Sequence, residues 1–135
     1  MSIRIVIGED SGVIQKLLKA VLEKEKDFEI VGTATDGEDT YNKIVSLKPD
    51  VVLIDHRMPK TFGMEIVKRV MSTEPVSIIM ITSAEPFDQI KAEALKYGAM
   101  SVVEKPKQLD FSSISRKLIT DIRTFSKMKP AKKTF

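Results

Sequence analysis

The chain returns five times to a short apolar run rich in β-branched residues, and this recurrence limits its fold more than any other feature. The runs cover residues 3–7, 29–34, 51–54, 77–81 and 101–103. Each run predicts a β-strand. The first, third and fourth are almost continuously apolar, which is typical of strands that are covered on both faces in a parallel sheet.

Apolar residues at helical spacing fill the intervals between these runs. The stripes lie within residues 13–22, 41–45, 66–71, 90–97 and 114–125, and Gly98 stands where the fourth helix should end. The order is therefore a strand followed by a helix, five times over. Such a chain predicts an α/β fold with a doubly wound, five-stranded parallel sheet between two layers of helices, joined by right-handed crossovers.

The length and composition favour one domain with an oxygen-ligated metal, if it holds a metal at all. A chain of 135 residues is long enough for one core and too short for two. It has no cysteine and one histidine, so disulfides, a thiolate nucleophile and cysteine-ligated zinc are excluded. No signal peptide is recognisable, and no run reaches the roughly 18 to 20 apolar residues of a membrane helix. We expect a soluble, cytoplasmic protein.

The positive charge of the chain is concentrated at its end. The formal net charge is +3, yet residues 116–135 alone contain seven Lys and Arg residues against the single acid Asp121. The rest of the chain is therefore net negative. We interpret residues 126–135 as a basic tail or linker after a domain that spans residues 1–125, with 127–135 a frayed end or connecting segment. Because the tail lacks interleaved aromatic residues, we do not expect this chain to bind nucleic acid.

Acidic residues follow two strands that should be neighbours in such a sheet. Glu9 and Asp10 come after the first strand and Asp55 comes after the third. Carboxylates crowded at one sheet edge raise one another's pKa unless a cation neutralises them, and Mg²⁺ prefers oxygen ligands of this kind. Glu9 and Asp10 could instead only stabilise the start of the next helix. That alternative does not explain an acid at the end of a buried strand.

Thr82 and Lys105 follow the fourth and fifth strands, at the same edge as Asp55. A Lys ammonium, a Thr hydroxyl and Mg²⁺ together would meet the three equatorial oxygens of a phosphoryl group. The Asp55 carboxylate would then act as the nucleophile and form an aspartyl phosphate. Taken singly, Thr82 and Lys105 could be ordinary strand-end or solvated residues, so the inference depends on their combination.

The four motifs in this order resemble the receiver domain of two-component response regulators across residues 3–125. They are Glu9-Asp10-Ser11, Asp55-His56-Arg57-Met58-Pro59 with Gly63, Thr82-Ser83, and Lys105-Pro106. The resemblance implies a flavodoxin-like (βα)5 fold. The strand order 2-1-3-4-5 is a known feature of the family and comes with the resemblance.

The resemblance also implies a role for each site residue. Asp55 would be the phosphoacceptor, Thr82 would move toward the phosphoryl group and Lys105 would bind it. Mg²⁺ would be held by Glu9, Asp10, Asp55 and the main-chain carbonyl of Arg57. The Lys105–Pro106 bond would be cis.

One position departs from the family pattern. Val102 stands where relatives usually carry the aromatic residue of the switch. Signal transmission would then depend on residues 82–86 and on the helix that follows them.

The expected partners follow from the same resemblance. A sensor histidine kinase would supply the phosphoryl group, and a downstream protein or output domain would dock near residues 91–101 and the last helix. The stretches 28–34 and 77–107 are most similar to the receiver domain of the chemotaxis methylesterase, which suggests chemotaxis. The chain would be no enzyme beyond its own phosphorylation and dephosphorylation. It could also be an unphosphorylated docking module, or a fragment of a regulator with a methylesterase or DNA-binding output.

Three other α/β classes fit the residues less well. A phosphatase of the dehalogenase-like class needs a second Asp two residues after its nucleophile, where this chain has Arg57. In a flavodoxin-like electron carrier, Glu9 and Asp10 would repel the flavin phosphate. A P-loop ATPase is excluded because the Gly-x-x-x-x-Gly-Lys-Ser/Thr motif is absent.

Overall fold

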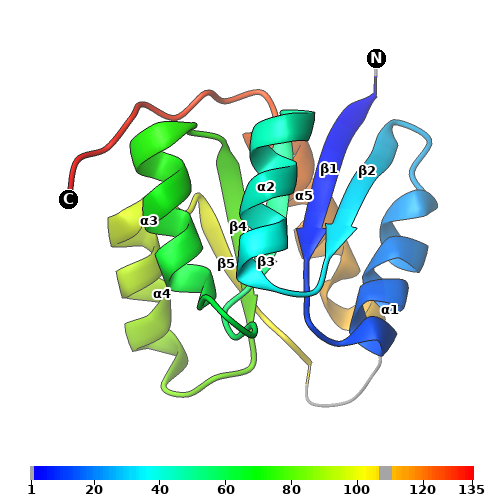
Figure 1. Cartoon of the computed structure of the whole chain (residues 1–135). Helices are drawn as coiled ribbons and strands as arrows, with labels where there is room; N and C mark the ends of the chain where they lie inside the picture. The colour runs from blue at the N-terminus through cyan, green and yellow to red at the C-terminus, as the bar shows by residue number, and fades with distance from the viewer. Residues whose placement is uncertain (1, 107–110) are drawn as a thin grey trace.

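The computed structural model describes residues 2–106 and 111–135 and alternates five strands with five helices (Figure 1). Each predicted strand is confirmed and is one residue longer than the sequence alone suggested. In chain order the elements are β1 (Ile3–Gly8), α1 (Gly12–Glu23), β2 (Phe28–Ala34), α2 (Gly37–Leu47), β3 (Val51–Asp55), α3 (Gly63–Thr73), β4 (Ser77–Thr82), α4 (Phe87–Tyr97), β5 (Ser101–Glu104) and α5 (Ser112–Phe125).

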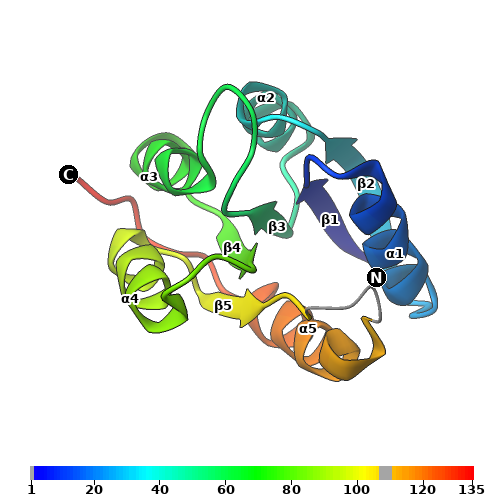
Figure 2. The same cartoon turned by 90° about the horizontal axis from the view of Figure 1, so that it is seen from below.

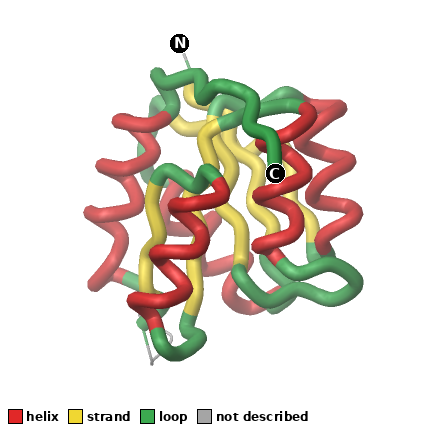
Figure 3. The backbone as a smooth tube through the Cα atoms, turned by 90° about the vertical axis from the view of Figure 1, so that its left-hand side faces the viewer, coloured by secondary structure: helices red, strands yellow, loops and turns green. Residues whose placement is uncertain are grey.

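The five strands form one parallel sheet in the order β2-β1-β3-β4-β5, as the resemblance implied. Helices α1 and α5 cover one face, and α2, α3 and α4 cover the other (Figure 2). The three layers also appear in the backbone trace of Figure 3. The chain is therefore a flavodoxin-like α/β/α sandwich. Within the described residues, no helix combines the length and hydropathy that a membrane span requires.

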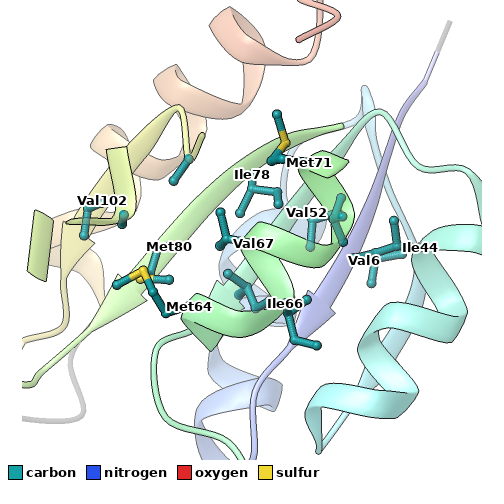
Figure 4. Packing of buried hydrophobic residues seen from close by; sticks show 14 of the residues in the cluster. Val6, Ile44, Val52, Met64, Ile66, Val67, Met71, Ile78, Met80 and Val102 are labelled. Carbon is teal, nitrogen blue, oxygen red and sulfur yellow. The ribbon is translucent and has the colours of Figure 1, made fainter. Parts of the chain in front are cut away.

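The core consists of two apolar layers, because the central strands send alternate side chains to opposite faces. In β1, Val6 packs on the side of α2 to α4, whereas Ile5 and Ile7 pack on the side of α1 and α5. Figure 4 shows the first layer, in which Met80 and Val102 lie on neighbouring strands. All five residues of β3 are buried. A fully buried Ile or Val side chain contributes about 1.5–3 kcal/mol relative to an exposed one.

Local residues define several helix ends. The Ser11 hydroxyl accepts the Ile14 N–H at 3.2 Å, and the Asp36 carboxylate accepts the Asp39 N–H at 2.8 Å. Both side chains satisfy a backbone donor that has no partner within the helix. Gly98 ends α4 at a φ of 119°, a conformation that other residues rarely adopt, so its predicted role as a C-terminal cap is confirmed.

Polar contacts tie α5 to the elements beside it. The Arg123 guanidinium pairs with Glu25 at 2.7 Å and with Asp27 at 2.9 Å, both in the segment before β2. The buried Asp121 carboxylate accepts the Ser101 hydroxyl of β5 at 2.7 Å. These contacts join α5 to the segment before β2 on one side of the sheet and to β5 on the other.

The basic tail forms no further helix or strand over residues 126–135, but it lies against the body of the domain. The Ser77 hydroxyl at the start of β4 lies 2.7 Å from the Phe125 carbonyl and 3.2 Å from the Met128 carbonyl, and its one proton is shared between them. The Lys133 N–H then donates to the carbonyl of Met71 at 2.8 Å. The tail thus crosses the edge where the strands begin, opposite the edge where they end (Figures 1 and 3).

Candidate functional site

The predicted site residues meet at the edge where the strands end. Asp55 is the last residue of β3 and Thr82 the last of β4, while Glu9 and Lys105 directly follow β1 and β5. These four strands are consecutive in the sheet, so their carboxyl ends lie side by side. The Lys105 N–H extends the ladder by donating to the Thr82 carbonyl at 2.7 Å. Parallel pairing therefore brings together residues that are far apart in the sequence.

Three carboxylates form an acidic cluster at this edge. One oxygen each of Glu9, Asp10 and Asp55 lies within 4.8 Å of the others. Glu9 is 1% exposed and Asp55 is 6% exposed, whereas Asp10 faces solvent. The cluster is thus buried on the protein side and open to solvent at Asp10. A hydrated divalent cation could enter from that side.

Lys105 provides the only cation that pairs with this cluster within the described residues. Its ammonium lies 2.7 Å from Glu9 Oε1 and 3.1 Å from Asp55 Oδ1. Burial acts to lower the pKa of Lys105, but the carboxylates of Glu9 and Asp55 outweigh it and raise the pKa above the usual value. Lys105 therefore stays charged at neutral pH and offsets one of the three negative charges.

The carboxyl group of Glu9 has a pKa above its ordinary value. Burial, reinforced by the nearby Asp55, raises its pKa to about 7, although Lys105 and the Ser11 N–H act in the opposite direction. The Ser11 N–H donates to Glu9 Oε2 at 3.1 Å. The other oxygen, Oε1, is buried, and its contact is the Lys105 ammonium at 2.7 Å. A carboxylate oxygen has two lone pairs, so one contact leaves room for a further cation.

These observations indicate that the carboxylate cluster could bind Mg²⁺. The donors are all oxygens, three carboxylates face a single lysine, and one side of the cluster is open to solvent. A softer metal would prefer sulfur or imidazole ligands, and the chain has no cysteine. The residues present thus match a hard divalent cation.

The hydrogen bonds of the described residues join the Thr82 hydroxyl to Ala84 and His56 and not to Asp55. Oγ1 of Thr82 accepts the Ala84 N–H at 2.9 Å and lies 3.5 Å from Nδ1 of His56. Burial, followed by the charge of Arg57, lowers the pKa of His56, so the imidazole is mainly neutral at pH 7. His56 was not among the site residues predicted from the sequence. The alternation of side chains along β3 and β4 could have indicated it.

The loop after β3 folds closely over Asp55. The Gly63 N–H donates to the His56 carbonyl at 3.0 Å, and a Cβ atom at Gly63 would overlap the Asp55 carbonyl oxygen. The Arg57 N–H points to Asp55 Oδ1 at 3.4 Å, a long contact, and the Arg57 side chain is exposed. Only a residue without a side chain fits at the start of α3. Glycine at this position therefore allows the loop to lie next to the phosphoacceptor candidate.

Two expectations about the neighbouring strand can be compared with the structure. Val102 is buried in the apolar layer beneath α3 and α4, where it pairs in register with Met80 (Figure 4). The cis bond implied at Lys105–Pro106 is wrong, because within the described residues the cis peptide bond is Glu85–Pro86. Both isomers of an X–Pro bond are accessible at small energetic cost, so the local sequence did not decide between them.

The fold and the site together define a class: a doubly wound α/β domain whose strand ends hold an acidic cluster, a lysine and a threonine. The family model described as the response regulator receiver domain matches residues 5–114. The chain belongs to this family of two-component response regulators.

The chain is similar to the receiver part of chemotaxis methylesterases. It is 36% identical over 107 residues to a protein-glutamate methylesterase/protein-glutamine glutaminase of Methanosarcina acetivorans, covering 78% of this chain and 30% of that protein. The crystal structure of the response regulator domain of Thermotoga maritima CheB superposes with a TM-score of 0.90 at 32% identity, covering 96% of this chain and all of that one. The chain spans about a third of the length of the curated relatives it matches.

A second similar structure is a complex that contains a phosphoryl analogue and a metal ion. In the CheX–CheY–BeF3–Mg²⁺ complex of Borrelia burgdorferi, the matching chain has a TM-score of 0.78 at 25% identity, with 90% of this chain and 87% of that one covered. That protein was therefore crystallised with Mg²⁺ and beryllofluoride.

Proposed function

We propose that this protein is a phosphorylation switch in which a sensor histidine kinase transfers a phosphoryl group to Asp55 in the presence of Mg²⁺. The observation that carries the proposal is the placement of Asp55 Oδ1. It lies 3.1 Å from the Lys105 ammonium, in a carboxylate cluster with Glu9 and Asp10. A strand-end carboxylate flanked by a cation and by candidate metal ligands suits attack on phosphorus better than a purely structural role.

The chemistry uses residues of this chain in distinct roles. An Asp55 oxygen forms a bond to phosphorus as the bond between phosphorus and the histidine nitrogen of the donor breaks, and that nitrogen leaves with its electron pair. Lys105 is placed to neutralise one phosphoryl oxygen, and Thr82 would donate its hydroxyl to another. Glu9, Asp10, Asp55 and the Arg57 carbonyl would hold Mg²⁺, which would supply further positive charge beside the phosphoryl oxygens. The complex of the Borrelia relative with Mg²⁺ and beryllofluoride supports this reading.

The phosphoryl group would act through an interaction surface. We assign residues 1–125 to the switch domain and 126–135 to a basic connecting tail. The downstream protein or output domain would dock on α4, β5 and α5. The likeness to methylesterases supports a role in chemotaxis with a methylesterase output, while the chain itself would catalyse only its own phosphorylation and dephosphorylation.

The test is the intact mass after incubation with acetyl phosphate, with and without Mg²⁺. We expect the wild type to gain about 80 Da, the mass of one phosphoryl group, only when Mg²⁺ is present. Asp55→Asn should show no gain. Asp50→Asn is the matched control, because Asp50 precedes β3 at the opposite edge and accepts the Arg4 N–H. It should be phosphorylated like the wild type.

Other outcomes would change the proposal in defined ways. A gain that persists in Asp55→Asn would place the phosphoryl group elsewhere. If the folded wild type binds Mg²⁺ and gains no mass from acetyl phosphate or from a histidine kinase, the chain is a docking module that keeps the receiver fold without the reaction.

A further inference from the structure

The Thr82 side chain projects to the sheet face that carries α3 and α4. Met80, two residues earlier in β4, belongs to the apolar layer on that face, and so does Ile54 of β3. Residues two apart along a strand point to the same side. His56, two residues after Ile54, therefore reaches the same side as Thr82. Parallel pairing places Asp55 beside Ile81, and His56 and Thr82 are the residues that follow this last pair.

The backbone holds the His56 ring in this position. The His56 N–H donates to the Ile81 carbonyl at 3.0 Å, and the His56 carbonyl accepts the Gly63 N–H at the same distance. Both neighbours belong to regular elements, β4 and the start of α3. The backbone of His56 is thus held between β4 and α3. From this position the Nδ1 atom of its ring lies 3.5 Å from Thr82 Oγ1.

The Thr82 hydroxyl has a single proton to donate, and this limits its contacts. One lone pair of Oγ1 already accepts the Ala84 N–H at 2.9 Å. The proton can then reach Nδ1 of His56, a long contact at 3.5 Å, in the tautomer that carries its hydrogen on Nε2. Within the described residues, no hydrogen bond joins this hydroxyl to Asp55 or to Lys105. A phosphoryl oxygen on Asp55 would have to compete with His56 for the same proton.

We propose that His56 is a positioning residue that holds the Thr82 hydroxyl away from Asp55 in the unphosphorylated protein and yields it when a phosphoryl group is present. The inference rests on the phosphoacceptor function proposed above. The His56 contact stabilises only the unmodified arrangement, so it shifts the population toward the inactive state. Val102 adds no aromatic ring on this face, whereas the imidazole of His56 lies next to the Thr82 hydroxyl.

The test measures the affinity for beryllofluoride with Mg²⁺, prepared from beryllium chloride and sodium fluoride, by titration followed in ¹H–¹⁵N NMR spectra. His56→Leu has a similar volume and no hydrogen-bond acceptor. We expect it to lower the Kd about two- to tenfold, which is the range that one hydrogen bond contributes. His56→Asn places an amide oxygen near the original Nδ1 and should keep the Kd close to that of the wild type.

A double-mutant cycle separates this role from a merely structural one. In a Thr82→Val background, which has no hydroxyl proton, His56→Leu should leave the Kd unchanged. An unchanged or raised Kd in His56→Leu alone, or the same change in both backgrounds, would overturn the inference while leaving Asp55 as the phosphoacceptor. Failure of the folded wild type to bind beryllofluoride would instead refute the phosphoacceptor function, and this inference with it. Melting temperatures of all variants confirm that they fold.

Discussion

Mg²⁺ binding by this protein should become tighter as the pH rises from 6 to 8, because Glu9 must lose a proton before it can bind a cation. Its pKa in the metal-free protein is raised to about 7, chiefly by burial. If one proton leaves on binding, the apparent Kd contains a factor of one plus the ratio of protonated to ionised Glu9. That factor is about 11 at pH 6 and about 1.1 at pH 8, so we expect about a tenfold gain in affinity.

Glu9 has the opposite effect on the stability of the metal-free protein, which should fall, not rise, with increasing pH. A carboxyl group whose pKa is higher in the folded protein than in the unfolded chain stabilises the fold fully below the unfolded value of 4.5. This contribution is lost as the pH rises through about 7. Stability without Mg²⁺ should therefore decline over that interval on account of Glu9, and added Mg²⁺ should restore more of it at pH 8 than at pH 6.

Isothermal titration calorimetry in two buffers with different ionisation enthalpies measures both the Kd and the protons released. We expect release of about 0.9 protons at pH 6 and about 0.1 at pH 8. Glu9→Gln, which cannot ionise, should bind Mg²⁺ more weakly and without this pH dependence. Because the pKa of His56 lies below its usual value, that residue should contribute little in this range. A wild-type Kd that varies less than twofold, or an equal slope in Glu9→Gln, would refute the reasoning.

Three further substitutions test the site and the core. Lys105→Met leaves the buried carboxylates without their cation and should lower the free energy of unfolding by about 3–5 kcal/mol at pH 8. Mg²⁺ should reduce this loss. Urea unfolding with and without Mg²⁺ measures the loss and its reduction. Gly63→Ala should force the Asp55 carbonyl to move, costing about 1–3 kcal/mol and slowing phosphorylation by acetyl phosphate, and a wild-type rate would contradict this. Ile79→Ala empties a fully buried position and should cost about 2–5 kcal/mol, whereas the control Val13→Ala, at a residue that is 58% exposed, should cost under about 0.5 kcal/mol.

The sequence by itself determined the order of elements and the parallel sheet, whereas the strand order 2-1-3-4-5 was implied by the family resemblance. Apolar runs and helical stripes are local patterns, and each strand was predicted to within one residue. Because parallel strands end at one edge, the convergence of Glu9, Asp55, Thr82 and Lys105 also followed from sequence order. The C-terminal cap at Gly98 was predictable because it depends on the backbone preference of a single residue.

Only the tertiary structure decided how the side chains are paired. The sequence placed Lys105 beside a phosphoryl group, and the structure adds its 2.7 Å contact with Oε1 of the buried Glu9. It also turns Thr82 toward His56 and lays the tail along Met71. Such contacts join residues distant in the chain, and their distances depend on the twist and register of the whole sheet. No local pattern encodes these quantities, whereas strand and helix periodicity is written in neighbouring residues.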